Sequence, residues 1–89
     1  MSIVEYTHKA REDLSRLDPQ LARRILKKVA FYSSQEHPLD FAKPLQGKWT
    51  DTFRFRIGDF RAIFYLDRNG VLSVLYILRI KHRKDVYDL

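Results

Sequence analysis

Three arginines alternate with apolar residues on either side of a Gly-Asp pair, in the order FRFRIGDFRAIF: Arg54, Arg56 and Arg61. A period of two is typical of half-buried antiparallel strands, so all three side chains are expected on the face away from the core. Facing side chains on paired strands lie about 5 Å apart and diagonal ones about 7–8 Å. Guanidinium groups this close repel one another unless an anion lies among them, and their planar forks match phosphate oxygens. A phosphate site is therefore favoured over a solvated strand face neutralised by Asp51, Asp59 and Asp67.

A cationic tail follows the last apolar run and holds a histidine, with a tyrosine five residues after it. His82 can titrate near neutral pH, and the cations beside it favour the neutral ring that can act as a base. Tyr87 offers an aromatic plane on which a nucleobase can stack and a phenol that can donate a hydrogen bond. The alternatives are that His82 is a surface or packing residue and that Tyr87 packs the C-terminus. A phosphate site beside groups for proton transfer and stacking indicates RNA.

Charge and composition narrow the function classes. Net charge is +6, and residues 43–89 hold 10 Lys/Arg against 5 Asp/Glu, whereas residues 1–42 hold 7 against 6. Such an asymmetry suggests nucleic acid, an acidic protein or an anionic membrane surface, with a basic surface kept for solubility as the alternative. The 89 residues, 45% of them hydrophobic, predict one globular domain over 1–89. No cysteine, no metal-ligand spacing, no secretory signal and no membrane-spanning run are visible, so neither cofactor nor metal is expected and the cytoplasm is the expected location.

The N-terminal half predicts a strand and two helices. Residues 3–6 are β-branched and aromatic, which favours a strand, and Thr7 suits a helix N-cap. Asp18-Pro19 ends one helix and caps the next, and the two helices are expected to form an αα-hairpin. Apolar residues recur at helical spacing along both: Ala10, Leu14, Leu17, Leu21, Ile25, Val29 and Tyr32.

The C-terminal half predicts three strands after a loop at 33–52, which has no sustained period and is expected to be pinned by Leu45 and Trp49. Strands are expected at 53–57, 60–66 and 71–80, with a tight turn at Gly58-Asp59 and a hairpin turn at Asn69-Gly70. The third is apolar on both faces and should be central, and residues 83–89 should form one helical turn or none. The fold class is thus α+β, in the order β-α-α-β-β-β. The helical hairpin packs on one face of an antiparallel sheet, and the arginine face stays open.

With the loop KPL (43–45), the segment FRFRIGDFRAIF (53–64) and the ending LRIKHRKDVY (78–87), the whole chain resembles the RelE/ParE toxins of bacterial and archaeal toxin–antitoxin pairs. The strand segment and the tail carry the resemblance. It implies a type II toxin that enters the ribosomal A site and cuts mRNA by attack of a ribose 2′-hydroxyl on the adjacent phosphate. ParE-like members share the fold but poison DNA gyrase without cleaving RNA. The retained His82 and Tyr87 favour the RNA-cleaving kind.

The resemblance also implies roles for particular residues. Arg61 matches the strand arginine assigned to phosphate stabilisation, Lys81 stands where the best-studied RelE type has a proposed general acid, and Tyr87 matches the stacking tyrosine. Arginine is a poor base, so that role is expected of His82 or Tyr87, with Arg83 or Lys81 as the acid. The remaining residues expected to bind RNA or phosphate are Arg54, Arg56, Lys48 and Lys84.

A toxin further implies a cognate antitoxin. An acidic segment that folds on binding is expected to cover the strand arginines or to displace the tail at 83–89. The complex is expected to be hetero-oligomeric and to bind operator DNA through the antitoxin. The expected partners are thus the antitoxin, mRNA and the ribosome. A third hypothesis, a basic domain without toxicity, stays open on the residues alone.

Overall fold

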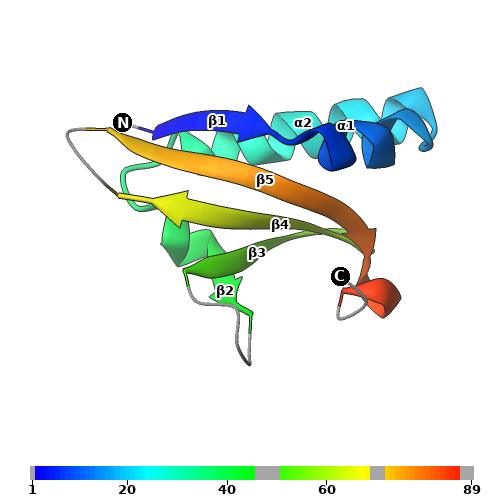
Figure 1. Cartoon of the computed structure of the whole chain (residues 1–89). Coiled ribbons are helices and arrows are strands. Elements are labelled where there is room, and N and C mark those ends of the chain that lie inside the picture. Colours follow the sequence, from blue (N-terminus) through cyan, green and yellow to red (C-terminus); the bar gives the residue numbers. More distant parts are fainter. Residues whose placement is uncertain (1, 46–50, 69–71, 87–89) are drawn as a thin grey trace.

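The computed structural model describes residues 2–45, 51–68 and 72–86. One five-stranded sheet runs in the order β1-β5-β4-β3-β2. Both helices lie on one side of it, as Figure 1 shows, and a short C-terminal turn lies on the other. The elements are β1 (Ser2–Tyr6), α1 (His8–Ser15), α2 (Pro19–Ser33), η1 (a 3-10 turn, Pro38–Phe41), β2 (Ala42–Pro44), β3 (Thr52–Ile57), β4 (Phe60–Asp67), β5 (Ser73–His82) and η2 (a 3-10 turn, Arg83–Asp85).

Both predicted helix starts are confirmed by their capping hydrogen bonds. The Thr7 side-chain oxygen accepts the backbone N–H of Ala10 at 3.2 Å, and an Asp18 carboxylate oxygen accepts that of Gln20 at 2.9 Å. Each bond satisfies one of the N–H groups that a helix leaves unpaired in its first turn. Pro19 occupies the first turn of α2, where its missing N–H removes no intrahelical bond.

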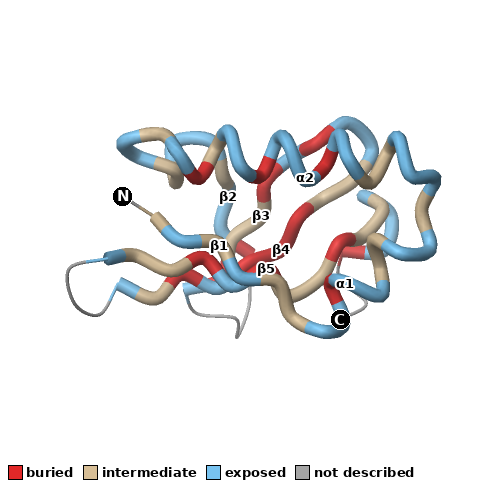
Figure 2. Tube along the Cα trace, turned by 90° about the horizontal axis from the view of Figure 1, so that it is seen from above, coloured by how far each residue is buried: buried red, intermediate tan, exposed pale blue. Residues whose placement is uncertain are grey.

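The helices bury the apolar face of the sheet, as expected. Ile25 and Val29 of α2 are fully buried against Phe55 and Phe64, whose rings stack with centroids 4.4 Å apart. In the view from above, α2 is buried at a few positions and exposed at most others (Figure 2). Among the described residues, no helix has the length and apolar character needed to span a bilayer.

The sheet is mixed rather than wholly antiparallel. β3, β4 and β5 pair antiparallel as predicted, but β1 pairs with β5 in parallel, from Ser2↔Ser73 to Tyr6↔Ile77. β5 is therefore an interior strand with a neighbour on each side, as its apolar sequence indicated, although β4 is the middle strand of the five. Its bounds shift by two residues from the predicted 71–80, and the predicted Asn69-Gly70 turn lies outside the described residues.

The prediction of a loop without regular structure over 33–52 is wrong for residues 38–44, which form η1 and β2. Ala42 pairs with Phe55 and Pro44 with Phe53, so β2 forms the second edge of the sheet. A strand of three residues that ends in proline is too short to show an alternating pattern in the sequence. It is extended because it pairs with β3. Leu45 is buried as expected, and Trp49 lies outside the described residues.

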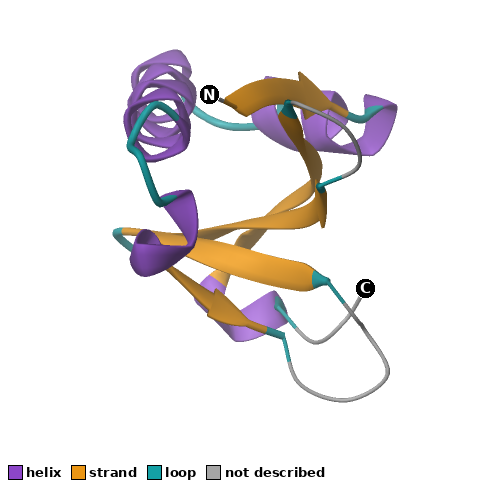
Figure 3. Cartoon of the chain, turned by 90° about the vertical axis from the view of Figure 1, so that its left-hand side faces the viewer, coloured by secondary structure: helices purple, strands orange, loops and turns teal. Residues whose placement is uncertain are grey.

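The expectation of an open arginine face is wrong around Ile63. This residue is fully buried and forms a second small core with Leu45 and Val86, against which Leu78 packs. Val86 directly follows η2. Its contact with this small core means that the C-terminal turn folds back under the sheet, on the side opposite the helices (Figure 3). The alternating pattern of the strand places Ile63 on this face correctly. The residue that covers it, Val86, lies 23 positions further along the chain.

Candidate functional site

Cations from three neighbouring strands form a row across the sheet. Arg56 of β3 is in register with Arg61 of β4, which is in register with Lys81 of β5. Arg54 lies two residues before Arg56 on β3, on the same face and in register with Ile63. The row, defined as Arg56, Arg61 and Lys81, therefore lies on the face turned away from the helices. Sequence parity predicted the arginines, and the register adds Lys81 to them.

Arg61 of the row is held by two hydrogen bonds. Its Nη1 donates to the backbone oxygens of Gly58 at 3.0 Å and Phe60 at 2.9 Å, which fixes the guanidinium beside the β3–β4 turn. Partial burial and then the nearby Arg56 lower the pKa of Arg61, and Asp59 opposes this only in part. Both the loss of hydration and the neighbouring cations disfavour the positive form of Arg61, and a bound anion would offset them.

The arginines border a recess of about 280 Å³ on the β2 side of the row. Arg54 is held there by a 3.3 Å hydrogen bond from its Nη1 to the backbone oxygen of Pro44. The sequence reasoning missed Lys43 and Phe41 as parts of this site, because it predicted no strand at 42–44 to align them with β3. The recess is lined by Asp40, Phe41, Ala42, Lys43, Arg54, Arg56 and Arg61.

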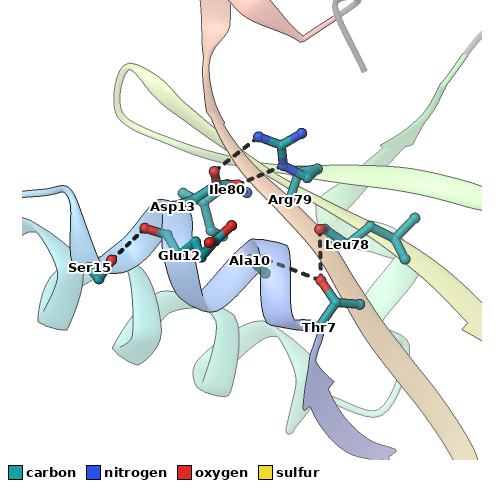
Figure 4. A network of polar contacts seen from close by, with 8 residues as sticks. All are labelled: Thr7, Ala10, Glu12, Asp13, Ser15, Leu78, Arg79 and Ile80. Carbon is teal, nitrogen blue, oxygen red and sulfur yellow. Dashed lines mark hydrogen bonds and ion pairs between the residues drawn. The ribbon is translucent and has the colours of Figure 1, made fainter.

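A carboxylate of α1 holds the end of β5 that carries Lys81. Asp13 accepts two hydrogen bonds from Arg79, at 2.9 and 3.0 Å, and one from the backbone N–H of Ile80 at 2.9 Å (Figure 4). β1 ends at Tyr6. The backbone N–H of Thr7 then donates to the backbone oxygen of Ile77 and its hydroxyl donates to that of Leu78, so beyond this point α1 lies along the edge of β5. Burial by itself raises the pKa of Asp13, but the hydrogen bonds from Arg79 and Ile80 outweigh it and the net pKa is lowered. No local pattern in the sequence predicts the contact between Asp13 and Arg79, which are 66 positions apart.

The structure turns His82 away from the row. His82 pairs with Phe60 and its ring meets that ring edge-on, with centroids 5.4 Å apart, on the helix side of the sheet. Its Nδ1 accepts the backbone N–H of Lys84 at 3.2 Å and so caps η2. In this arrangement the neutral ring carries its proton on Nε2, where it is a donor.

The rest of the tail is only partly described. The backbone N–H of Arg83 donates to the Asp59 oxygen at 2.8 Å, and the two exposed side chains lie 3.8 Å apart, close enough for a weak ion pair. Lys84 is exposed, and the predicted Lys48 and Tyr87 lie outside the described residues. Within the described ranges, no group of three or more histidines and acids is arranged to hold a metal ion.

Fold and row together define a small α+β protein with a cationic sheet face suited to phosphate. A sequence model of the ParE toxin of type II toxin–antitoxin systems matches residues 4–87. The chain therefore belongs to the RelE/ParE superfamily and is a toxin of the type II toxin–antitoxin class. It is 34% identical over 84 residues to Toxin RelG of Mycobacterium tuberculosis, an alignment that covers 94% of this chain and 93% of the relative.

Solved structures share this architecture. The toxin–antitoxin complex RelBE2 of Mycobacterium tuberculosis contains a chain with a TM-score of 0.71 and 32% identity, covering 91% of this chain and 96% of that one. The archaeal RelE–RelB complex of Pyrococcus horikoshii has a TM-score of 0.66 at 22% identity, covering 92% and 94%. At that lower identity the likeness shows the fold alone.

Proposed function

We propose that this toxin is a ribosome-dependent mRNA endonuclease, which cleaves by attack of a ribose 2′-hydroxyl on the adjacent phosphate. The observation that supports it best is the row of Arg56, Arg61 and Lys81, held in register on three strands. Cleavage of this kind passes through a crowded, doubly charged phosphorane, which fixed cations stabilise more than they stabilise the ground state. The likeness to Toxin RelG and to the RelBE2 toxin supports the same proposal.

In the proposed mechanism, Arg61 and Arg56 bind the two non-bridging oxygens of the scissile phosphate. Lys81, at the end of the row, or Arg83, which comes two residues later, donates a proton to the leaving 5′ oxygen. The 2′-hydroxyl loses its proton to a base. His82 is poorly placed for that role, because its unprotonated Nδ1 already accepts the Lys84 N–H and its ring faces Phe60. We therefore assign the base to Tyr87, which also stacks on a nucleobase.

Two substitutions separate these roles. Tyr87→Phe should lower the cleavage rate at least about 100-fold, since general-base groups contribute about 10²–10⁴-fold. His82→Asn keeps an acceptor for the Lys84 N–H and should stay within about fivefold of the parent rate. The opposite ranking, measured by cleavage of mRNA in a translating extract, would assign the base to His82.

The matching of the ParE family model supports a second candidate, inhibition of DNA gyrase without cleavage of RNA. Induction of the toxin separates the two, with mRNA 5′ ends mapped and DNA breaks scored in the same culture. The endonuclease predicts new mRNA 5′ ends and intact chromosomes, whereas the gyrase inhibitor predicts DNA breaks with intact mRNA. Intact mRNA at saturating toxin would refute the first proposal.

We further propose that a cognate antitoxin neutralises the chain, as the solved toxin–antitoxin complex RelBE2 suggests. The face that carries the row also exposes Ile3 and, in register with each other, Tyr65 and Tyr76. A segment with acidic and apolar residues could therefore cover both parts of this face and exclude RNA. Tyr76→Ser should then weaken the antitoxin complex, measured by titration calorimetry, without changing mRNA cleavage.

A further inference from the structure

The outer face of α2 is a second basic surface, separate from the row. Its four cations occupy two adjacent turns, at positions i, i+1, i+4 and i+5, and α2 contains no acidic residue. None of the four forms an ion pair with another described residue. Residues four apart on a helix are separated by about 6 Å along its axis, so the charges form a compact grid. This grid consists of Arg23, Arg24, Lys27 and Lys28.

The grid surrounds a surface hollow of about 510 Å³ that also contains an exposed aromatic ring. Phe31 is 52% exposed, and the Nζ of Lys28 lies 5.8 Å from its ring centroid. About half of this ring stays in water among the cations, where it is open to a stacking partner. This is the arrangement with which proteins bind single-stranded nucleic acid, in which bases stack on aromatic rings while cations bind phosphates.

A contact between two aromatic rings joins this hollow to the arginine recess. Phe31 meets Phe41 edge-on at 6.4 Å, and Phe41, itself 43% exposed, lines the recess. Phe41 in turn stacks on Tyr32 at 5.1 Å, which holds its ring in place.

At the other end of the grid, Arg24 approaches the β3–β4 turn. Its Nη2 is 3.7 Å from where a Cβ of Gly58 would lie, and the oxygen of Gly58 accepts a hydrogen bond from Arg61. Cations and aromatic rings thus continue from the row to α2, and the acidic side chains near this path are Asp40, which lines the recess, and Asp59, which lies near Arg83 and Arg61.

We propose that the grid on α2, with Phe31 and Phe41, is a binding track for single-stranded RNA that continues from the arginine recess. The inference rests on the proposed function for the choice of RNA as the nucleic acid. The two exposed rings favour RNA over an acidic polypeptide, which needs cations alone, and they favour single strands because bases in a duplex cannot stack on them. The track holds RNA on one side of the scissile phosphate, outside the reacting groups.

The test uses a fluorescein-labelled 12-nucleotide oligouridine with 2′-O-methyl riboses, which binds but lacks the nucleophile for cleavage. Affinity is measured by anisotropy from 50 to 300 mM salt. The variant R23Q/R24Q/K27Q/K28Q should weaken binding at least about tenfold and reduce the salt slope by about 3, since each phosphate contact contributes about 0.7. The control K9Q/R11Q/R16Q/R68Q removes the same charge elsewhere and should change affinity less than about threefold. Thermal melting checks that both variants fold.

Phe31→Leu tests the stacking separately. It should weaken binding at least about fivefold with the salt slope unchanged, because it removes a stacking plane and no charge. Equal weakening by the two quadruple variants, or unchanged binding in Phe31→Leu, would overturn the track. A 20-residue oligoglutamate serves as a second probe. The track would also be overturned if R23Q/R24Q/K27Q/K28Q lost binding to this oligoglutamate but retained binding to RNA. Wild-type protein that binds the oligouridine normally but leaves mRNA intact would refute the proposed endonuclease and leave the track standing.

Discussion

The two basic surfaces of this toxin carry similar charge in different ways. The row of Arg56, Arg61 and Lys81 is set by the register of three strands, and partial burial, then the neighbouring Arg56, lowers the pKa of Arg61. The grid on α2 consists of exposed side chains at helical spacing, with no described acidic partner. The difference teaches that the row concentrates charge on one phosphate, whereas the grid distributes charge along a chain of phosphates.

The two surfaces also differ in what supports them. Behind the row, Asp13 joins α1 to Arg79 and Ile80, one residue from Lys81, and the Asp13 side chain is only 11% exposed. The grid has no comparable buried support, because it lies on the outer side of a helix whose other side packs on the core. Perturbation of the scaffold should therefore affect the row first.

The largest expected effect is the loss of Arg61 from the row, compared with the loss of one arginine from the grid. Arg61→Ala should lower mRNA cleavage at least about 100-fold, since removal of one preorganised donor to a transition-state oxyanion has an effect of about 10²–10³. Arg23→Ala should lower it less than about threefold, because one of four distributed contacts is lost. Cleavage is followed by primer extension in a translating extract. Equal losses in the two variants would remove the distinction between the surfaces.

The support of the row should dominate stability. Asp13→Asn leaves Arg79 without its charged partner in a largely buried place, and we expect a loss of about 2–3 kcal/mol in the free energy of unfolding. Asp59→Asn disrupts the exposed, 3.8 Å approach to Arg83 and should change it by less than about 1 kcal/mol. Urea denaturation measures both. If the Asp13 variant is as stable as the Asp59 variant, α1 does not hold β5 through this carboxylate.

The pH dependence of stability should follow from the same carboxylate. Its pKa is lowered from the ordinary 3.8 in the folded protein, so the unfolded chain binds its proton first as the pH falls. The stabilisation by Asp13 is thus complete above about pH 5 and is lost as the pH falls through the folded pKa. The stability difference between the parent and Asp13→Asn should be constant from pH 5 to 8 and narrow below about pH 4. A difference that widens toward acid pH would contradict this sign.

The smallest effect is expected where the two surfaces meet. Gly58 has a φ of +58°, a left-handed conformation that disfavours side chains, although a Cβ there would be in ordinary contact with Arg24 at 3.7 Å. Gly58→Ala should lower the free energy of unfolding by about 1 kcal/mol, and Gly58→Asn by less, because asparagine tolerates this conformation. Thermal melting of both variants checks the order, and a more stable alanine variant would contradict it.

The parts of the fold that local signals determine could be predicted from the sequence. The caps at Thr7 and Asp18 and the alternation around Arg54 and Arg56 depend on neighbours a few residues away, and all four residues lie as expected. The parts that depend on distant partners could not. The site was predictable in its arginines but not in the orientation of His82, which lies in register with Phe60 and accepts a hydrogen bond from the Lys84 N–H.

Three further features show the same limit. β2 exists because β3 pairs with it, Ile63 is buried because Val86 folds back over it, and Asp13 meets a residue 66 positions away. In each case the stabilising contact joins segments that show no common pattern along the chain. Phe41 and Lys43 belong to the site because the pairing of β2 with β3 places them beside the arginines.

The central claim, that the row stabilises a phosphorane formed by a 2′-hydroxyl, is tested most directly on a single scissile nucleotide. Ribosomes are programmed with an mRNA that carries either a ribose or a 2′-deoxyribose at the mapped cleavage position, and wild-type toxin is added. We predict cleavage of the ribose mRNA to a 2′,3′-cyclic phosphate and a 5′-hydroxyl, and no cleavage of the 2′-deoxy mRNA. Cleavage of the 2′-deoxy mRNA, or products with 5′-phosphate ends, would contradict it.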